Sequence, residues 1–250
     1  MQKVWALYGF CYTLIFYDDF HFISNMNKKK SRISASVFHN ASFINALLFF
    51  LLTVSFLILT YFVLSDRTAH WDYYISDVLQ HQQHTVLDTV MRAFSWLGRV
   101  RVAFFAICIT ALLFLISGKK REAILICSTI LTGAVSWTLK MLIDRPRPGS
   151  DIVRVIEETK YQSFPSGHVL FYTVFFGLLS LIVFYAKRLS RRSKTILIFL
   201  LVLIVMCGAV SRIYLGAHWF TDILGGLIVG IQFLIIARIL YLKNRRQSNL

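Results

Sequence analysis

Three clusters of polar residues in the second half of this chain combine side chains suited to binding and transferring an anionic group. In the first cluster, Lys140 lies near the end of an apolar stretch, and Arg145 and Arg147 follow within a few residues. Pro146 and Pro148 stop a helix and stiffen the chain after it. A charge at membrane depth is costly and usually functional, although a lysine near a helix end can also extend its amine to the interface. We predict that these three cations, at the stiffened end of a helix, form an anion clamp, which is a set of positive side chains that binds one anion.

The second cluster is Ser166, Gly167 and His168, at the predicted start of the next apolar helix. Ser166 suits an N-cap position, and Gly167 allows the backbone to approach a ligand closely. A helix N-terminus offers unpaired N–H groups and a partial positive charge, which makes it a natural phosphate site. His168 lies in the first turn, where it is placed to act as an acid or a base. The alternative is a capping sequence with an incidental histidine.

The third cluster contains Arg212, His218 and Asp222. If His218 and Asp222 lie on one helix, their spacing of four residues puts them on the same face, where the carboxylate accepts a hydrogen bond from the imidazole. That pairing fixes the tautomer and raises the nucleophilicity of the other ring nitrogen. Asp222 is also the only acidic residue after Glu158, and an acid that enters an apolar helix needs a partner. A purely structural ion pair is the alternative.

The three clusters together supply cations, two histidines, one carboxylate and a helix N-terminus. They contain neither the set of carboxylates that holds Mg²⁺ nor the Cys and His ligands that hold Zn²⁺. We therefore expect phosphoryl transfer without a metal ion or any other cofactor. The cations would neutralise the phosphoryl oxygens, one histidine would attack phosphorus, and the other would protonate the leaving oxygen.

The order and spacing of the clusters resemble the tripartite signature of the phosphatidic acid phosphatase type 2 superfamily. The matching residues are Lys140-x6-Arg147-Pro148, Pro165-Ser166-Gly167-His168 and Ser211-Arg212-x5-His218-x3-Asp222. The signature extends over about a third of the chain, from Lys140 to Asp222.

The resemblance implies a phosphate-binding role for five residues, which are Lys140, Arg147, Ser166, Gly167 and Arg212.

It also implies that His218 is the nucleophile, that Asp222 orients His218, and that His168 is the general acid and later activates water. Asp144 and Arg145 lie inside the variable x6 stretch and receive no role from the resemblance.

Membrane members of this superfamily remove phosphate from lipid phosphates and diphosphates, and some transfer phosphate to another lipid. The resemblance implies a membrane lipid phosphatase, with undecaprenyl diphosphate as the first candidate substrate, and phosphatidic acid and phosphatidylglycerol phosphate close behind. A lipid phosphotransferase with the same phosphohistidine is the alternative, and a non-enzymatic lipid transporter is a remote one. The soluble haloperoxidases of the superfamily do not fit the membrane segments.

The composition indicates which elements position these clusters. Of the 250 residues, 57% are hydrophobic and 16% are charged, whereas a soluble domain has about 45–50% and about 25%. This excludes an ordinary soluble enzyme. The excess lies in blocks of roughly 20 residues, the length of a membrane-spanning helix. We expect an all-α bundle of six transmembrane helices, at about 41–64, 102–117, 123–143, 167–186, 195–210 and 222–242.

The net charge of +15 supports a membrane protein more than a nucleic-acid-binding one. Short basic clusters at 28–32, 119–121, 187–194 and 243–246 alternate with the other connections, and such clusters mark the cytoplasmic side. The three polar clusters then lie on the extracytoplasmic side of the cell membrane, where a lipid phosphate can enter from the bilayer. We expect no nucleic acid partner.

The connection at 65–101 has partial helical periodicity, which predicts amphipathic helices at the interface or over the bundle. His81 and His84 within it have no nearby carboxylate or cysteine and are expected to be surface residues. The predicted organisation is an N-terminal extension at 1–37, a membrane domain at 38–243 and a basic cytoplasmic tail at 244–250.

Overall fold

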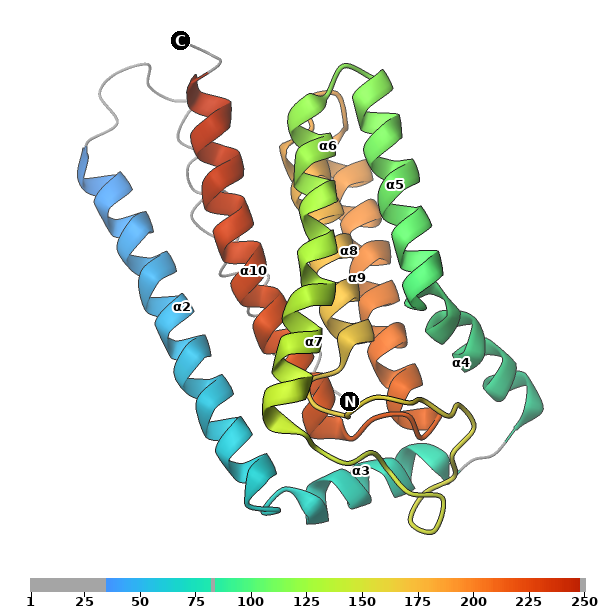
Figure 1. The fold of residues 1–250 in the computed structure, drawn as a ribbon. Coiled ribbons are helices and arrows are strands. Elements are labelled where there is room, and N and C mark those ends of the chain that lie inside the picture. Colours follow the sequence, from blue (N-terminus) through green and yellow to red (C-terminus); the bar gives the residue numbers. More distant parts are fainter. Residues whose placement is uncertain (1–34, 82–83, 248–250) are drawn as a thin grey trace. The chain divides into compact units, whose positions relative to one another are not determined.

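A computed structural model describes residues 35–81 and 84–247, and every regular element in this part of the chain is a helix (Figure 1). The predicted all-α class is confirmed. The elements are α2 (Ala35–Leu64), α3 (Ala69–Gln80), α4 (Thr85–Leu97), α5 (Val100–Ile116), α6 (Lys120–Cys127), the 3₁₀ turn η1 (Ser128–Ile130), α7 (Leu131–Ile143), α8 (Gly167–Tyr185), α9 (Arg191–Tyr214) and α10 (Phe220–Gln247).

Within the described residues, five helical segments are long and apolar enough to cross a membrane: Phe43–Leu64, Lys120–Ile143, Gly167–Tyr185, Arg191–Tyr214 and Phe220–Lys243. The remaining predicted span, at about 102–117, corresponds to α5. It meets the same criterion together with α4, to which it is joined at an angle of 57°. The chain is a multi-pass membrane protein with up to six spans, in agreement with the prediction.

The chain divides into two compact units, residues 1–54 and residues 55–250. In the described part of the first unit, α2 exposes large apolar side chains such as Phe43, Leu47 and Phe50, as a helix in contact with lipid does. The predicted N-terminal extension lies outside the described residues up to position 34, and the end of the basic tail does so from position 248. All three polar clusters belong to the second unit.

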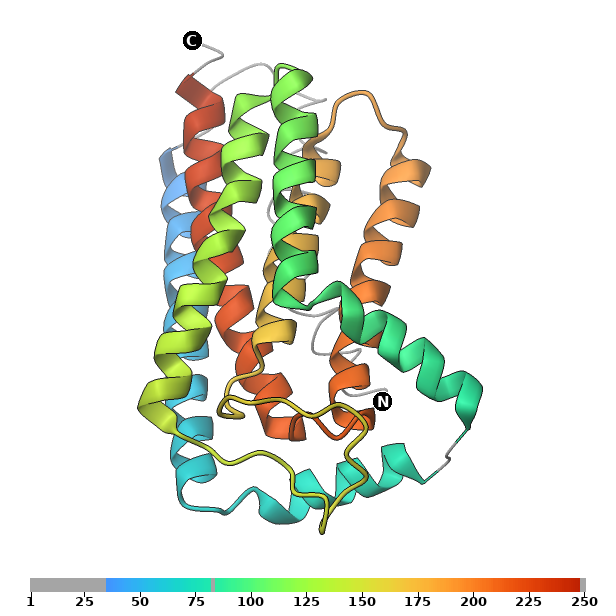
Figure 2. The same cartoon turned by 45° about the vertical axis from the view of Figure 1, so that its right-hand side comes forward.

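Helix α8 is the centre of the second unit. It packs against α9, α10 and α7, and most of its side chains are buried. Helix α4 packs against α9, and α3 contacts both α9 and α10. Figures 1 and 2 show that α3 crosses the end of the bundle at which α7 and α9 finish and α8 and α10 begin. The four helix ends that carry the polar clusters therefore meet at one end of this unit.

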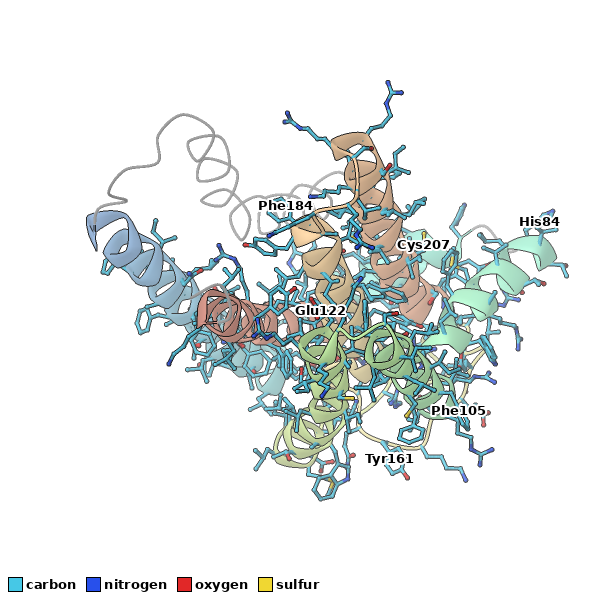
Figure 3. All side chains as sticks on the ribbon, turned by 90° about the horizontal axis from the view of Figure 1, so that it is seen from above. His84, Phe105, Glu122, Tyr161, Phe184 and Cys207 are labelled. Atoms are coloured by element: carbon cyan, nitrogen blue, oxygen red, sulfur yellow. The ribbon has the colours of Figure 1, made fainter. Side chains whose placement is uncertain are left out.

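The outer surface of the bundle is apolar, whereas some of the polar side chains inside it pair with one another. Figure 3 shows Phe105 on the outside of α5, where its side chain is 61% exposed. The same view shows Glu122 of α6 toward the middle, where its Oε1 accepts a hydrogen bond of 3.0 Å from Tyr241 Oη of α10. This distribution is the one expected when lipid surrounds the helices.

The connection at 65–101 forms two helices, α3 and α4, as its periodicity predicts. His84 is exposed at the far end of α4 (Figure 3), and its Nδ1 accepts a hydrogen bond of 3.2 Å from Val86 N. This ring caps a helix. No group of three metal-ligating side chains occurs within residues 35–81 and 84–247.

Candidate active site

The turn between α9 and α10 and the loop at 144–166 are held together by α3. Gln80, at the end of α3, donates from Nε2 to the backbone oxygens of Arg154 and Tyr214, at 2.9 Å each. Its Oε1 accepts from Arg154 N at 3.0 Å. One buried amide side chain thus fixes the loop and the turn to each other.

His218 and Asp222 form the predicted pair, although not on one helix. Helix α9 ends at Tyr214 and α10 begins at Phe220, so His218 lies in the turn between them. The condition for a shared helical face, that both residues lie on one helix, is therefore not met. Asp222 lies in the first turn of α10, and its side chain points back toward the connection between α9 and α10. Its Oδ2 is 3.1 Å from His218 Nδ1 and accepts a hydrogen bond from Trp219 N at 2.9 Å. The other ring nitrogen, Nε2, points away from the carboxylate.

Lys140 and Arg147 lie on one side of the His218 imidazole. Arg147 Nη1 is 3.4 Å from His218 Nε2 and donates to the backbone oxygen of Ala217 at 2.5 Å. Lys140 Nζ donates to the backbone oxygen of Ser163 at 2.9 Å. Arg147 Nε bonds the backbone oxygen of Tyr161, whose own ring lies at the outer edge of the loop (Figure 3). Two of the three predicted clamp cations are therefore beside the imidazole.

Arg145 is not part of the clamp, and the prediction that it binds the anion was wrong. Its side chain is 9% exposed, and its guanidinium forms ion pairs with two carboxylates. Nη1 lies 2.6 Å from Asp222 Oδ1, and Nη2 lies 2.6 Å from Asp72 Oδ2 of α3. An arginine with both nitrogens in short ion pairs has little capacity to bind a further anion.

Burial and the nearby cations control protonation around His218. Burial, followed by the charges of Arg147, Lys140 and Arg212, holds the pKa of His218 well below its ordinary value of 6.5. The ring is therefore neutral at pH 7. Burial and the Arg212 charge also lower the pKa of Arg147 from its ordinary value to about 10, so this side chain stays positive. A neutral imidazole beside a permanent cation is suited to attack on an anionic phosphorus.

The N-terminus of α8 presents polar atoms without partners. Ser166 is the N-cap residue, as predicted, but its hydroxyl makes no capping hydrogen bond. Ser166 Oγ and His168 Nε2 are both buried and have no hydrogen-bond partner among the described residues. Gly167 approaches α7 here, because a Cβ at this position would lie 2.8 Å from Ser136 Oγ. An unpaired buried polar atom is costly, which indicates that a polar ligand fits against this helix end.

Arg212 is fully buried, and only Nη1 of its guanidinium makes hydrogen bonds within the described residues. Nη1 donates to Glu157 Oε2 at 3.0 Å and to the hydroxyl of Ser95. Nε and Nη2 have no partner within the part of the chain that the structure describes. These two nitrogens form the side edge of the guanidinium, which binds two oxygens of one phosphate in parallel. Glu157 and Ser95 thus hold Arg212 by one end and leave its side edge for an anion.

The break between α4 and α5 also approaches His168. A Cβ built on Gly98 would lie 2.5 Å from His168 Cδ2 and 2.5 Å from Tyr172 Oη. Tyr172 in turn donates to the backbone oxygen of Phe94 at 2.6 Å. Gly98 is therefore the residue that lets α4 lie against the ring of His168.

The site also contains five residues that the signature does not include: Asp72, Ser95, Glu157, Ser163 and Thr221. For Asp72, the sequence carried a usable signal. Asp72, Ser76 and Gln80 are spaced four residues apart and form a buried polar row on α3. For the loop residues Glu157 and Ser163, we find no comparable pattern in the sequence.

The chain is similar in sequence to two curated proteins. The chain is 34% identical over 101 residues to phosphatidylglycerophosphatase B of Bacillus subtilis, which is 40% of this chain and 48% of that relative. It is 34% identical over 109 residues to "Putative undecaprenyl-diphosphatase YbjG" of Escherichia coli, which is 43% of this chain and 50% of that relative. The chain thus spans about half the length of the curated relatives it matches.

A crystal structure of a transmembrane PAP2-type phosphatidylglycerolphosphate phosphatase from Bacillus subtilis has the same fold. The TM-score is 0.70 at 23% identity, over 77% of this chain and 94% of that one. The model of the PAP2 superfamily matches residues 121–246, which include every residue of the tripartite signature. This chain belongs to the PAP2 superfamily.

Proposed function

We propose that the protein is a membrane lipid phosphatase, which hydrolyses a phosphate or diphosphate monoester of a lipid through a phosphohistidine and without a metal ion. The observation that carries this proposal is a group of buried polar atoms, at the start of α8 and the end of α9, that have no partner among the described residues: Ser166 Oγ, His168 Nε2, and Nε and Nη2 of Arg212. One tetrahedral anion offers each of them a partner. Membership of the PAP2 superfamily supports the same reaction class.

In the first step, His218 Nε2 attacks phosphorus. The proton on Nδ1 is held by Asp222 Oδ2 at 3.1 Å, so the lone pair is on Nε2. The N–P bond forms as the P–O bond to the lipid breaks, and the leaving oxygen takes a proton from His168. Arg147, Lys140 and Arg212 stabilise the charge on the three non-bridging oxygens.

In the second step, water attacks the phosphohistidine. His168, now neutral, accepts a proton from the water as the O–P bond forms and the N–P bond breaks. Inorganic phosphate leaves, and His168 and His218 return to their starting states. No oxidant, metal ion or second substrate is needed for either step.

We also propose that the site lies on the extracytoplasmic side. The basic clusters at 119–121 and 187–194 lie at the α5–α6 and α8–α9 connections, at the opposite ends of the helices from the site. Basic connections mark the cytoplasmic side. A tag placed after Leu250 should accordingly resist protease added outside intact cells, and cleavage of that tag would contradict the orientation.

The substrates that we propose are undecaprenyl diphosphate, phosphatidylglycerol phosphate and phosphatidic acid. The names of the two relatives support the first two. All three place a terminal phosphate at the membrane surface, where the site can bind it while the lipid tail stays in the bilayer.

The test is phosphate release by the full chain in detergent with EDTA, with each of the three lipids and with His218→Ala as the blank. We expect release in EDTA that is lost in His218→Ala, and a labelled protein intermediate that is stable in base and labile in acid. Release that requires added Mg²⁺ would contradict the metal-free reaction. Phosphorylation of an added acceptor lipid, in place of release, would identify a phosphotransferase.

A further inference from the structure

We infer that Asp72 and Arg145 are positioning residues, which hold the Asp222 carboxylate in the orientation that pairs with His218. This inference rests on the proposed function, because it assigns His218 as the nucleophile. Neither residue belongs to the tripartite signature, and Asp72 comes from α3, far from the other site residues in sequence.

Arg145 bridges two carboxylates. Nη1 is 2.6 Å from Asp222 Oδ1 and 2.7 Å from Thr221 Oγ1, and Nη2 is 2.6 Å from Asp72 Oδ2. All four side chains are buried. Ion pairs of this length in a buried site have a fixed geometry, because both partners have lost the water that would otherwise compete.

Asp72 holds the backbone as well as the guanidinium. Its Oδ1 accepts from Thr221 N at 2.8 Å, and the Thr221 hydroxyl lies within 3.0 Å of both carboxylate oxygens. Thr221 directly precedes Asp222 at the start of α10. Asp72 therefore fixes the main chain that carries Asp222, while Arg145 fixes its carboxylate.

The two oxygens of Asp222 have separate tasks. Oδ1 accepts from Arg145, while Oδ2 accepts from Trp219 N, from Ser163 Oγ and from His218 Nδ1. The carboxylate can rotate away from the imidazole only by breaking the ion pair on Oδ1. Arg145 thus selects one rotamer of Asp222, the rotamer that orients the nucleophile.

Asp72 also balances charge. Arg145 with Asp222 alone would be a neutral pair, in which the guanidinium draws charge away from the His218 hydrogen bond. With Asp72 present, one cation serves two carboxylates, and the group keeps a net charge of −1 next to the imidazole. The remaining charged or titratable groups around His218 are Arg147, Lys140, Arg212 and His168, from the loop, α7, α9 and α8.

The face that α3 turns toward the site fits this role. Its buried row is polar, with Asp72, Ser76 and Gln80, whereas Trp71 and Tyr74 are exposed. A helix at a membrane interface places aromatic side chains against lipid in this way. The helix therefore contacts the site through polar atoms, and Asp72 is the charged one among them.

The experiment compares Asp72→Asn and Arg145→Gln with Asp77→Asn, an exposed acid on the same helix. The readout is kcat/KM against pH for the full chain in detergent. Each of the two site variants should lose about 10- to 100-fold, by analogy with the loss found when a residue that orients a metal ligand is removed. Asp77→Asn should behave as wild type.

The acid limb of the profile of kcat/KM against pH, where activity falls as the pH is lowered, distinguishes a positioning role from a merely structural one. This limb reports the His218 proton, since only the neutral ring attacks. Asp72→Asn removes a negative charge, so the protonated ring is less stabilised and the limb should move to lower pH. Arg145→Gln removes a positive charge, so the limb should move to higher pH. A structural defect lowers the plateau without opposite shifts.

Opposite shifts support the inference, and unmoved limbs or equal shifts in one direction overturn it. Where either variant fails to fold, Asp72→Glu and Arg145→Lys replace it, because they keep the charge. Their activity should fall while the pH of the acid limb stays unchanged. Full activity in both variants would overturn the inference. If the wild type releases no phosphate from any lipid, the proposed function fails. The ring of His218 can then be titrated by ¹⁵N NMR, with His218→Gln for assignment, and opposite shifts in the two variants would still be required.

Discussion

The starts of α10 and α8 meet in one site but are built in opposite ways. At α10, the Asp222 carboxylate accepts from His218, Arg145, Ser163 and the Trp219 backbone. At α8, Ser166 Oγ and His168 Nε2 have no partner among the described residues, although both are buried. One helix end has a carboxylate saturated with hydrogen bonds, and the other has two buried side-chain atoms without a partner among the described residues.

The difference indicates a division of labour. A saturated, buried network holds a group in one geometry, because each movement breaks several bonds at once. Unpaired buried atoms cost stability until a ligand binds them, so they indicate where the ligand goes. We therefore expect the α10 side to set the nucleophile and the α8 side to bind and protonate the substrate. Four substitutions test this division.

The largest effect should come from the saturated side, in Asp222→Asn. Asparagine has one acceptor oxygen in place of two, so when that oxygen accepts from Arg145 the NH2 group faces His218 and favours the wrong tautomer of the ring. The comparable change in hydrolytic triads lowers kcat by about 10⁴. The variant should fold, because the amide keeps the size of the carboxylate. Phosphate release and thermal unfolding in detergent measure the two quantities, and undiminished release would remove Asp222 from its proposed role.

On the unpaired side, His168→Gln should lower release from a lipid substrate by about 10²–10⁴, the contribution of a general acid. The loss should shrink with an aryl phosphate, because a good leaving group needs little protonation. We would measure the two substrates side by side with the same enzyme preparation. Equal losses for both would contradict the role of His168 as an acid for the leaving group.

Arg212→Lys tests whether the free guanidinium edge binds phosphate. Lysine keeps the charge but loses the two parallel nitrogens, so we expect a loss of about 10²–10³ in kcat/KM, as for removal of one oxyanion donor. Wild-type kinetics would show that charge alone is sufficient.

The smallest effect should come from Gly98→Ala. The added methyl group must displace the ring of His168 or the Tyr172 hydroxyl, each 2.5 Å from its position, and we expect about a tenfold loss of activity from a shift of this kind. Gly133→Ala in α7 is the matched control, because nothing lies within 4 Å of its new Cβ. Equal activity in both variants would mean that the contact with His168 does not matter.

Much of the fold was predictable from the sequence, because apolar blocks of membrane length determine the helices directly. The tripartite clusters were also found, since their residue types and spacing are unusual in apolar surroundings. One conclusion about an individual residue failed. Arg145 looked equivalent to Arg147, two positions away, and only α3 distinguishes them: Asp72 takes the guanidinium of Arg145. Contacts between residues 73 positions apart have no signature in one sequence.

The start of the last helix was predicted near Asp222 and lies at Phe220, but the surroundings of His218 were left open. The spacing of His218 and Asp222 allowed one continuous helix, whereas α10 begins between them. The pair forms all the same, because the Asp222 carboxylate also accepts a hydrogen bond from Trp219 N. This bond holds the connection between α9 and α10 against the start of α10. Side-chain capping of a turn resembles helical spacing in the sequence, and the two cannot be separated without coordinates.

The position of Asp222 in the chain has a consequence for biosynthesis. Asp72 and Arg145 are translated first, and each neutralises the other while the helices that follow are still being made. The carboxylate that completes the group arrives only with α10, the last helix in the described part of the chain. The catalytic centre that we propose therefore assembles at the end of membrane insertion, and a chain that stops before α10 contains His218 without the carboxylate that orients it. Phosphatase activity in a growing cell would thus report on completed insertion as well as on substrate supply.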